Sequence, residues 1–260
     1  MPRCPEICCQ INWPQIVSVF TFQSFVIMDR TAAIGVLSRI GWLSRQSKEL
    51  QQSLFGASSL RVCEEGESIY SLGDEPGGLF GLAAGQIKVL IAPALLPPTF
   101  VSIAQPGWWV GEAALISKTP RRAELTAKSR CSVLHIGNAA VEKLATANPN
   151  LWRSLAEITV SHLDHALATV ATLAQKDPRI RVVATLAHTV STSLDNTGVI
   201  VPLTHDELGE MTRLSRVAVR NILLGLQNED LIHMSYGRLT VLNPRKMVAK
   251  LDELLNEAGK

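Results

Sequence analysis

The residues best suited to binding a charged ligand stand in one stretch, "GEAALISKTPRRAELTA", from Gly111 to Ala127. A Gly-Glu pair, Gly111 and Glu112, opens it, and two adjacent arginines, Arg121 and Arg122, follow. An arginine guanidinium is a planar fork of donors that suits phosphate oxygens. The stretch therefore predicts either a phosphate pocket or an ordinary turn with a solvated basic tip, depending on the elements around it.

A second set of charged residues lies near the C-terminus. Residues 177–260 hold ten Lys and Arg and ten Asp and Glu, and ten minus ten gives no net charge. The positive charges are nevertheless uneven, because no acidic residue stands between 211 and 228. A helix with an arginine-rich first half could enter the major groove of DNA, or it could be a solvated surface helix. The arginines concerned are Arg213, Arg216, Arg220 and Arg238.

The cysteines offer a third kind of chemistry. Their odd number fits no disulfide framework, which suits a reducing compartment such as the cytoplasm. Three of them form a C-x3-C-C pattern, and an iron–sulfur or zinc site would need a fourth ligand. The pattern indicates either such a site or reduced, structural thiols. The five are Cys4, Cys8, Cys9, Cys63 and Cys131.

Composition limits the classes of protein to consider. The chain has 260 residues, 47% of them apolar and 18% charged, so it is globular and has room for one large or two ordinary domains. Polar residues interrupt the apolar residues 7–28, so a membrane span is not expected. Residues 1–28 are expected to be an extension, or translation starts at Met28. Glu112 and the six histidines are not spaced in the sequence like a catalytic nucleophile and its base, so an enzyme is not expected.

The positions of these residues depend on the elements that carry them. Residues 29–55 show helical spacing, and short apolar segments separated by Gly, Pro and Asp between 60 and 136 predict a small antiparallel barrel or sandwich. A long helix without Gly or Pro follows, within residues 149–176. Its apolar residues are spaced by three and four, which indicates a two-stranded coiled coil or a helix lying on the barrel. They are Leu151, Leu155, Ile158, His162 or Leu163, Ala166 or Leu167, Val170 and Leu173.

The C-terminal part has the signals of a winged helix-turn-helix. Asp177 and Pro178 predict the start of a helix, and Thr204 with Glu207 forms a capping box before a second one. Ser215 can cap a third helix from Arg216. A strand around 200 and a hairpin at 236–237 complete the order of elements.

Residues 40–245 resemble the Crp/Fnr superfamily of bacterial transcription regulators. The resemblance rests on "GESIYSLGDEPGGLFGLAAGQIKVL", "GEAALISKTPRRAELTA", the long helix before "DPR", and "LTHDELGEMTRLSRVAVRNILLGLQNEDLI", in that order. It implies an α+β chain with a cyclic-nucleotide-binding-type β-barrel (jelly roll) over 29–148, a dimerisation helix over 149–176, a winged helix-turn-helix over 177–245 and a tail helix over 246–260. It also implies a homodimer on a two-fold-symmetric DNA site, with RNA polymerase as a further partner.

The resemblance implies an effector site around the first stretch. In members that bind cyclic nucleotides, the residue matching Glu112 takes the ribose 2′-hydroxyl and the residue matching Arg121 pairs with the phosphate. Gly111, Ala113 and Arg122 complete the expected site, although Arg122 stands where the family usually has Ser or Thr. Ala166 and Leu167 replace residues that contact the base in some members. The expected effector is a cyclic nucleotide or another small molecule, or the site takes no ligand.

The resemblance also places the DNA contacts. Val217 stands where the family often has a Glu that reads cytosine, so the best-known family operator is not expected; an apolar contact with a thymine methyl would suit it. A redox or metal sensor using the N-terminal cysteines, or a regulator without effector, remains the alternative. The expected DNA-binding residues are Thr204, Arg213, Ser215, Arg216, Val217, Arg220, Asn221 and Arg238.

Overall fold

The computed structural model of the chain describes residues 28–92, 97–190, 198–235 and 238–258. The predicted N-terminal extension with Cys4, Cys8 and Cys9 lies outside the described residues, as does the predicted wing tip at 236–237. No helix within the described ranges combines the length and apolarity needed to cross a membrane.

The predicted helical segment 29–55 consists of three short helices. They are α1 (Arg30–Leu37), the 3-10 helix η2 (Leu43–Arg45) and α2 (Lys48–Gly56). Gly41 breaks the run because its φ is +80°, and a Cβ there would lie 1.8 Å from the carbonyl oxygen of Gly107. The Ser47 side chain then accepts from the backbone N–H of Leu50 and starts α2.

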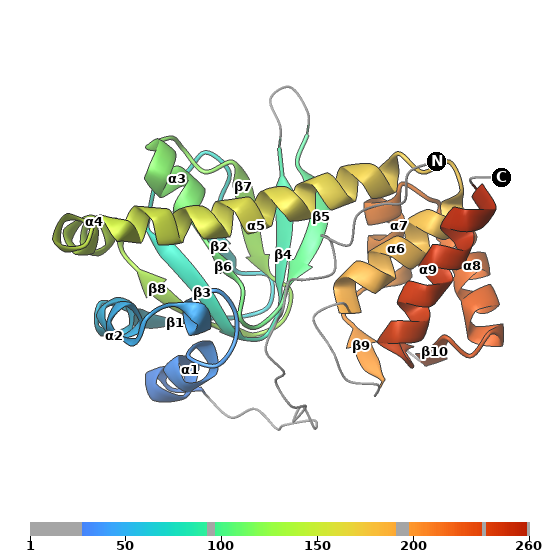
Figure 1. Cartoon of the computed structure of the whole chain (residues 1–260), viewed down its shortest axis with the longest axis horizontal. Coiled ribbons are helices and arrows are strands. Elements are labelled where there is room, and N and C mark those ends of the chain that lie inside the picture. The colour runs from blue at the N-terminus through green and yellow to red at the C-terminus, as the bar shows by residue number, and fades with distance from the viewer. Residues whose placement is uncertain (1–27, 93–96, 191–197, 236–237, 259–260) are drawn as a thin grey trace.

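Two antiparallel four-stranded sheets pack face to face in the N-terminal domain (Figure 1). Their strand orders are β1-β8-β3-β6 and β2-β7-β4-β5, with a buried apolar core between them. Pairing between the two sheets does not close a barrel in the described residues, so the jelly roll is a sandwich. The strands are β1 (Ser59–Cys63), β2 (Ser68–Tyr70), β3 (Leu79–Ala84), β4 (Ile87–Ile91), β5 (Thr99–Ala104), β6 (Trp109–Val110), β7 (Ala123–Ala127) and β8 (Cys131–Ile136).

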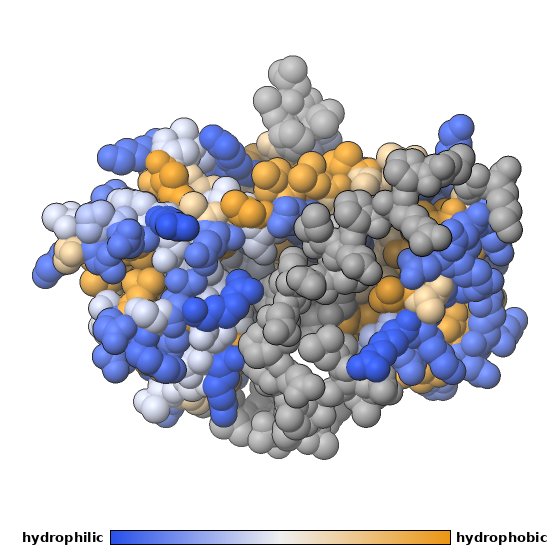
Figure 2. Space-filling model, viewed as in Figure 1, coloured by the Kyte–Doolittle hydropathy of each residue, from blue (hydrophilic) through white to orange (hydrophobic). Residues whose placement is uncertain are grey.

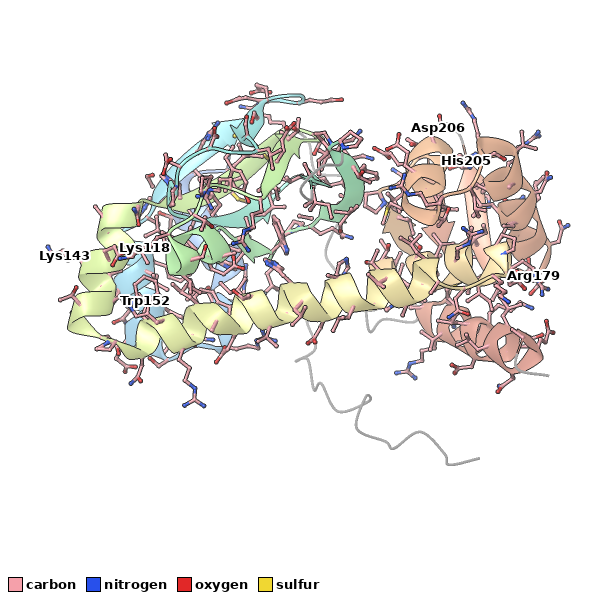
Figure 3. The ribbon with its side chains drawn as sticks, turned by 90° about the horizontal axis from the view of Figure 1, so that it is seen from above. Lys118, Lys143, Trp152, Arg179, His205 and Asp206 are labelled. Atoms are coloured by element: carbon pink, nitrogen blue, oxygen red, sulfur yellow. The ribbon has the colours of Figure 1, made fainter. Side chains whose placement is uncertain are left out.

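Three further helices belong to this domain, one between two strands of the sandwich and two after its last strand. The short α3 (Glu112–Ser117) lies between β6 and β7, and α4 (Asn138–Ala147) follows β8. The long α5 (Asn150–Leu173) then runs along the sandwich toward the C-terminal domain, as Figure 3 shows from above. Pro149 separates α4 from α5.

The apolar stripe predicted along the long helix divides into two parts. Leu151, Leu155 and Ile158 are buried in the core of their own domain, so the alternative of a helix lying on the barrel applies to these three residues. Further along α5 the large apolar side chains are between 55% and 65% exposed, and Figure 2 shows hydrophobic side chains gathered over this part of the helix. These exposed residues, here called the α5 stripe, are Val160, Leu163, Leu167 and Val170.

The C-terminal domain has the predicted order of a winged helix-turn-helix. Its three-stranded wing sheet has the order β10-β11-β9. Asp177 starts the first helix by accepting a hydrogen bond from the backbone N–H of Arg179 (2.7 Å). The elements are α6 (Pro178–Val190), β9 (Val199–Val201), α7 (His205–Thr212), α8 (Arg216–Asn228), β10 (Ile232–Ser235), β11 (Arg238–Val241) and α9 (Pro244–Ala258).

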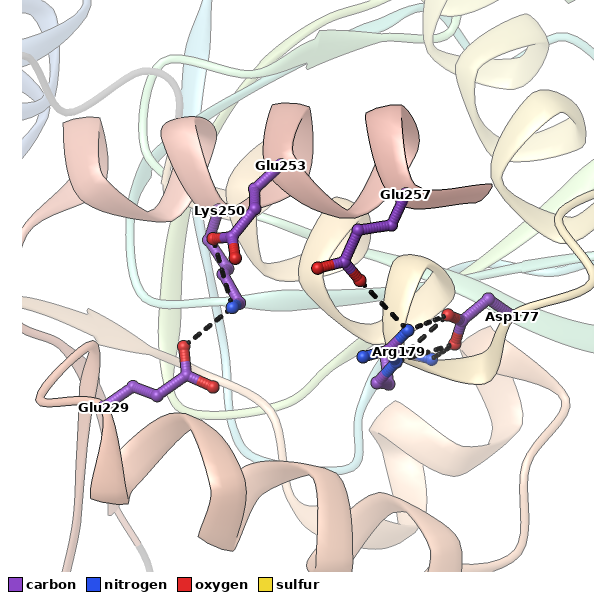
Figure 4. A network of polar contacts seen from close by, with 6 residues as sticks. All are labelled: Asp177, Arg179, Glu229, Lys250, Glu253 and Glu257. Atoms are coloured by element: carbon purple, nitrogen blue, oxygen red, sulfur yellow. Dashed lines mark hydrogen bonds and ion pairs between the residues drawn. The ribbon is translucent and has the colours of Figure 1, made fainter. Parts of the chain in front are cut away.

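The tail helix α9 packs against α6 and is tied to the domain by ion pairs (Figure 4). Lys250 pairs with Glu229, just after α8, at 2.9 Å, and Arg179 of α6 pairs with Glu257 at 3.5 Å. The helix begins at Pro244 rather than at the predicted 246, because proline is well suited to the first helical position. The tail is therefore attached to α6 by packing and by surface ion pairs, and to the end of α8 through Glu229.

Candidate effector site and DNA interface

The Gly-Glu pair lies where β6 turns into α3. Gly111 has φ +112°, and a Cβ at this position would lie 2.4 Å from the carbonyl oxygen of Gly78. Both the backbone angle and this close approach require glycine. The turn buries Glu112, the first residue of α3, instead of leaving it on the surface.

Arg121 lies inside the same turn. Its guanidinium donates to the carbonyl oxygens of Gly111 (3.1 Å) and Gly78 (2.8 Å), and it lies 4.4 Å from the ring centre of Tyr70. The side chain is only 4% exposed, and its Nε atom is buried without a hydrogen-bond partner. The fork is thus held at the turn, and its buried Nε–H donor is still unused.

Glu112 connects the turn to the long helix. Its Oε1 accepts from Thr159 Oγ1 (3.3 Å) and contacts Nδ1 of His162 (3.1 Å), and both partners lie on α5. Its Oε2 is buried without a partner in a residue that is 1% exposed. Sequence reasoning missed Thr159 and His162 as site residues; their spacing of three along one helix was the available signal.

The other predicted effector residues lie apart from this group. Ala113 is exposed on α3, and Arg122 is exposed and donates to Thr119 Oγ1 at 3.4 Å. Ala166 and Leu167 are also exposed, on α5. The structure therefore brings Gly111, Glu112 and Arg121 together and leaves Arg122 outside.

The predicted DNA-binding residues of α8 share one exposed face. The opposite face is buried through Val219, Leu223 and Leu226, which fixes the rotation of the helix. The Ser215 side chain accepts from the Ala218 backbone N–H (3.2 Å) and caps the helix as predicted. The exposed face carries Arg216, Val217, Arg220, Asn221 and Leu224.

The remaining predicted DNA-binding residues lie at the ends of α7 and in the wing. Thr204 caps α7, and its side chain accepts from the Glu207 backbone N–H (3.2 Å), which confirms the capping box. Arg213 ends α7 in the left-handed conformation, with φ 56°, and is exposed. Arg238 is exposed at the start of β11 in the wing.

The two domains contact each other at the start of α7, where Figure 3 labels His205 and Asp206. Glu207 pairs with Lys88 of β4 (3.0 Å) and with Lys128, which follows β7. Phe100 of β5 is buried in the core of the C-terminal domain, and Ile103 packs against it. The first helix of the helix-turn-helix is therefore docked on one sheet of the N-terminal domain.

The charge of Glu207 should make this contact sensitive to acid. Burial alone would raise its pKa, but hydrogen bonds from Lys128, the Thr204 backbone and Lys88 outweigh burial and lower the pKa to about 2. A depressed pKa contributes stability that is complete above the ordinary value of 4.5 and is lost as the pH falls toward about 2. The full difference corresponds to roughly 3 kcal/mol, and partial exposure of Lys88 reduces it.

Glu207→Gln should remove this pH dependence. In urea unfolding, the stability advantage of the wild type over Glu207→Gln is expected to shrink by about 2–3 kcal/mol between pH 6 and pH 2.5. Glu210→Gln, an exposed position on the same helix, is the matched control and should run parallel to the wild type. Parallel curves for Glu207→Gln as well would contradict the assigned contact.

The described cysteines lie opposite each other in neighbouring strands. Cys63 of β1 pairs in register with Cys131 of β8, and both are buried as free thiols. Burial raises the pKa of both thiols, that of Cys131 to about 12, which opposes formation of the reactive thiolate. The described residues contain no group of three or more His, Cys, Asp or Glu placed to hold a metal ion.

Two family models match the two domains. The cyclic nucleotide-binding domain matches residues 60–148, and the Crp-like helix-turn-helix domain matches residues 180–249. The cAMP-activated global transcriptional regulator CRP of Pasteurella multocida is 26% identical over 174 residues, covering 65% of this chain and 83% of the relative. Transcription regulators thus match both halves of the chain.

Solved structures share the fold. FixK2 from Bradyrhizobium japonicum aligns with a TM-score of 0.65 at 20% identity, covering 74% of this chain and 96% of that one. The c-di-GMP-responsive global regulator CLP of Xanthomonas campestris aligns with a TM-score of 0.57 at 22% identity, covering 76% and 99%. At this level of sequence identity, the likeness shows that the fold is shared and nothing further.

Proposed function

We propose that this chain, which belongs to the Crp/Fnr superfamily of transcription regulators, binds a two-fold-symmetric DNA site as a homodimer under the control of a small effector. The observation that carries the DNA-binding part is the exposed face of α8, where Arg220 and Asn221 stand together on a helix that is capped by Ser215. Arginine and asparagine are the side chains that most often read guanine and adenine in the major groove.

The direct test is selection of bound fragments from random DNA by the full-length chain, with and without effectors. Recovery of a two-fold-symmetric sequence with half-sites about one helical turn apart supports the proposal. Recovery of unrelated fragments contradicts it.

The same role implies a place in the cytoplasm and contact with RNA polymerase, in keeping with regulation of transcription rather than catalysis.

The effector part of the proposal rests on two buried polar atoms that have no hydrogen-bond partner. Glu112 Oε2 can accept a hydrogen bond from a ligand hydroxyl, and the Nε of Arg121 can donate to a phosphate oxygen. Both atoms are buried, where a polar group without a partner is costly. The contacts to a base are different, since Ala166 and Leu167 offer no side-chain hydrogen bond. We therefore propose an effector that carries both a phosphate and a hydroxyl group, such as a cyclic mono- or dinucleotide.

Arg121→Lys should abolish most of the thermal stabilisation by such an effector. Cyclic AMP, cyclic GMP and c-di-GMP are the probes, and a ligand at a hundred times its Kd stabilises by about 2.7 kcal/mol, which is several degrees in Tm. Lysine keeps the charge but loses the fork, so the shift should fall. Arg122→Lys is the matched control next to it, and its exposed side chain should leave the shift intact. Absence of a shift in wild type with all three probes would remove this effector class.

We propose that effector binding influences the DNA-binding domain through contacts between the two domains. Glu112 is bonded to α5 through Thr159 and His162, and Glu207 of α7 is bonded to the sheet that carries β4 and β7. An effector that draws Glu112 away from Thr159 and His162 would loosen α5, which also contacts α6 of the helix-turn-helix domain. We propose that this shifts the population between two arrangements of the helix-turn-helix domains.

A further inference from the structure

We infer that Val217 is a specificity-determining residue and that it selects a thymine by contact with its 5-methyl group. This inference rests on the proposed DNA-binding function and adds the base that one side chain reads. Val217 is the second residue of α8 and is 68% exposed, the most exposed of the large apolar side chains in the described part of the chain. Covering this exposed apolar side chain with an apolar group of a bound partner would be favourable, because apolar surface is then removed from water.

The rotation of α8 fixes where Val217 points. Because Val219, Leu223 and Leu226 are buried, the residues at 217, 220, 221 and 224 lie on the opposite side. Positions three and four apart are neighbours on a helix surface, so Val217 lies next to Arg220 and Asn221. The three side chains therefore meet the same few base pairs when this face enters the groove.

Arg216 is directed toward a different part of the DNA. Its guanidinium pairs with Asp206 of α7 at 3.2 Å, so it leans toward the first helix of the pair. In a helix-turn-helix the first helix crosses the phosphate backbone and the second reads the bases. Arg216 thus lies on the backbone side, and Val217 is left as the first residue of α8 on the base-reading face.

The chemistry of the groove then decides which base suits Val217. In the major groove guanine and adenine present N7 acceptors, cytosine presents an amino donor, and thymine alone presents a methyl group. A valine placed against a donor or acceptor leaves that group without a partner and therefore disfavours the base. Contact with the thymine methyl buries apolar surface on both partners, which corresponds to about fourfold in affinity for one methyl group.

Replacing thymine by deoxyuridine tests this directly, because it removes only the methyl group. Each thymine of a symmetric site selected by the full-length wild-type chain is replaced in turn, in both half-sites together. At one position wild type should lose affinity by about tenfold to twentyfold, the product of two fourfold losses. Val217→Ala keeps only one methyl group and should show a clearly smaller difference between the thymine and deoxyuridine forms of that site. Leu224→Ala, at the other exposed apolar residue of the face, should retain the full difference.

The outcomes separate the inference from the function on which it rests. If selection yields no symmetric site, the DNA-binding proposal itself fails. If a site is recovered but no thymine shows a methyl effect that depends on Val217, the inference is overturned while DNA binding stands. An effect that persists unchanged in Val217→Ala also overturns it, because the methyl group is then read by another residue.

Discussion

Arg220→Ala is expected to lower the affinity of the full-length chain for its selected site by between about thirtyfold and twenty-five-thousandfold. A bidentate arginine–guanine contact contributes about 1–3 kcal/mol, and a homodimer contains two copies. Arg220 is exposed on the same face of α8 as Val217 and Asn221, and its removal leaves the buried face of the helix unchanged. The loss should therefore be one of binding and not of folding.

The two arginines of α8 should fail in different ways. Arg220→Ala is expected to relax the preference at one base pair of each half-site, whereas Arg216→Ala should weaken binding to all sequences to a similar degree and reduce the dependence on salt. The difference follows from the pairing of Arg216 with Asp206, which directs it toward the phosphate backbone. Titration of site variants at several salt concentrations distinguishes the two patterns.

Arg153→Ala is the control for charge. Arg153 is exposed near the start of α5, in the other domain, and carries the same charge as the two arginines of α8. It should leave affinity, base preference and salt dependence close to those of wild type. Unchanged affinity in Arg216→Ala or Arg220→Ala would contradict a DNA contact by that residue.

The helix-turn-helix could be predicted from sequence because its signals are local. Thr204 with Glu207, and Ser215 before α8, are caps whose partners lie three residues away. The apolar spacing of α8 likewise determines which face is buried. A short window of sequence is enough for each of these features, and the structure agrees with all of them.

The features that sequence could not give depend on contacts between distant segments. Gly41 interrupts the predicted helical segment 29–55 by packing on Gly107, which is far away in the chain. Glu112 is bonded to α5, 47 and 50 residues later, and Glu207 is bonded to Lys128, 79 residues earlier. Spacing along one helix cannot show that the first half of an apolar stripe is covered by its own domain.

Leu167→Glu is expected to convert the proposed homodimer into a monomer. The α5 stripe exposes Val160, Leu163, Leu167 and Val170, spaced by three, four and three residues. This is the spacing of a two-stranded coiled-coil seam, in which each apolar side chain fits between side chains of a second helix. A glutamate in the middle of the seam would place two like charges in a buried contact, which is strongly unfavourable without a cationic partner.

The measurement is the molar mass in solution, with 28.3 kDa for one chain as the reference. Wild type should have twice this mass at micromolar concentration, and Leu167→Glu should have the mass of one chain with the same secondary structure. Leu255→Glu is the control, because Leu255 is an exposed leucine on α9, away from the stripe. A dimer that survives Leu167→Glu would place the interface elsewhere.

Loss of the dimer should also reduce DNA binding, even though α8 is untouched. Two linked half-site contacts gain from a high effective concentration, and a monomer keeps only one of them. Leu167→Glu should therefore bind an isolated half-site as well as wild type does and lose the advantage of the symmetric site. This result separates the α5 stripe from α8: the stripe determines how many recognition helices reach the DNA together, and α8 determines which bases each one reads.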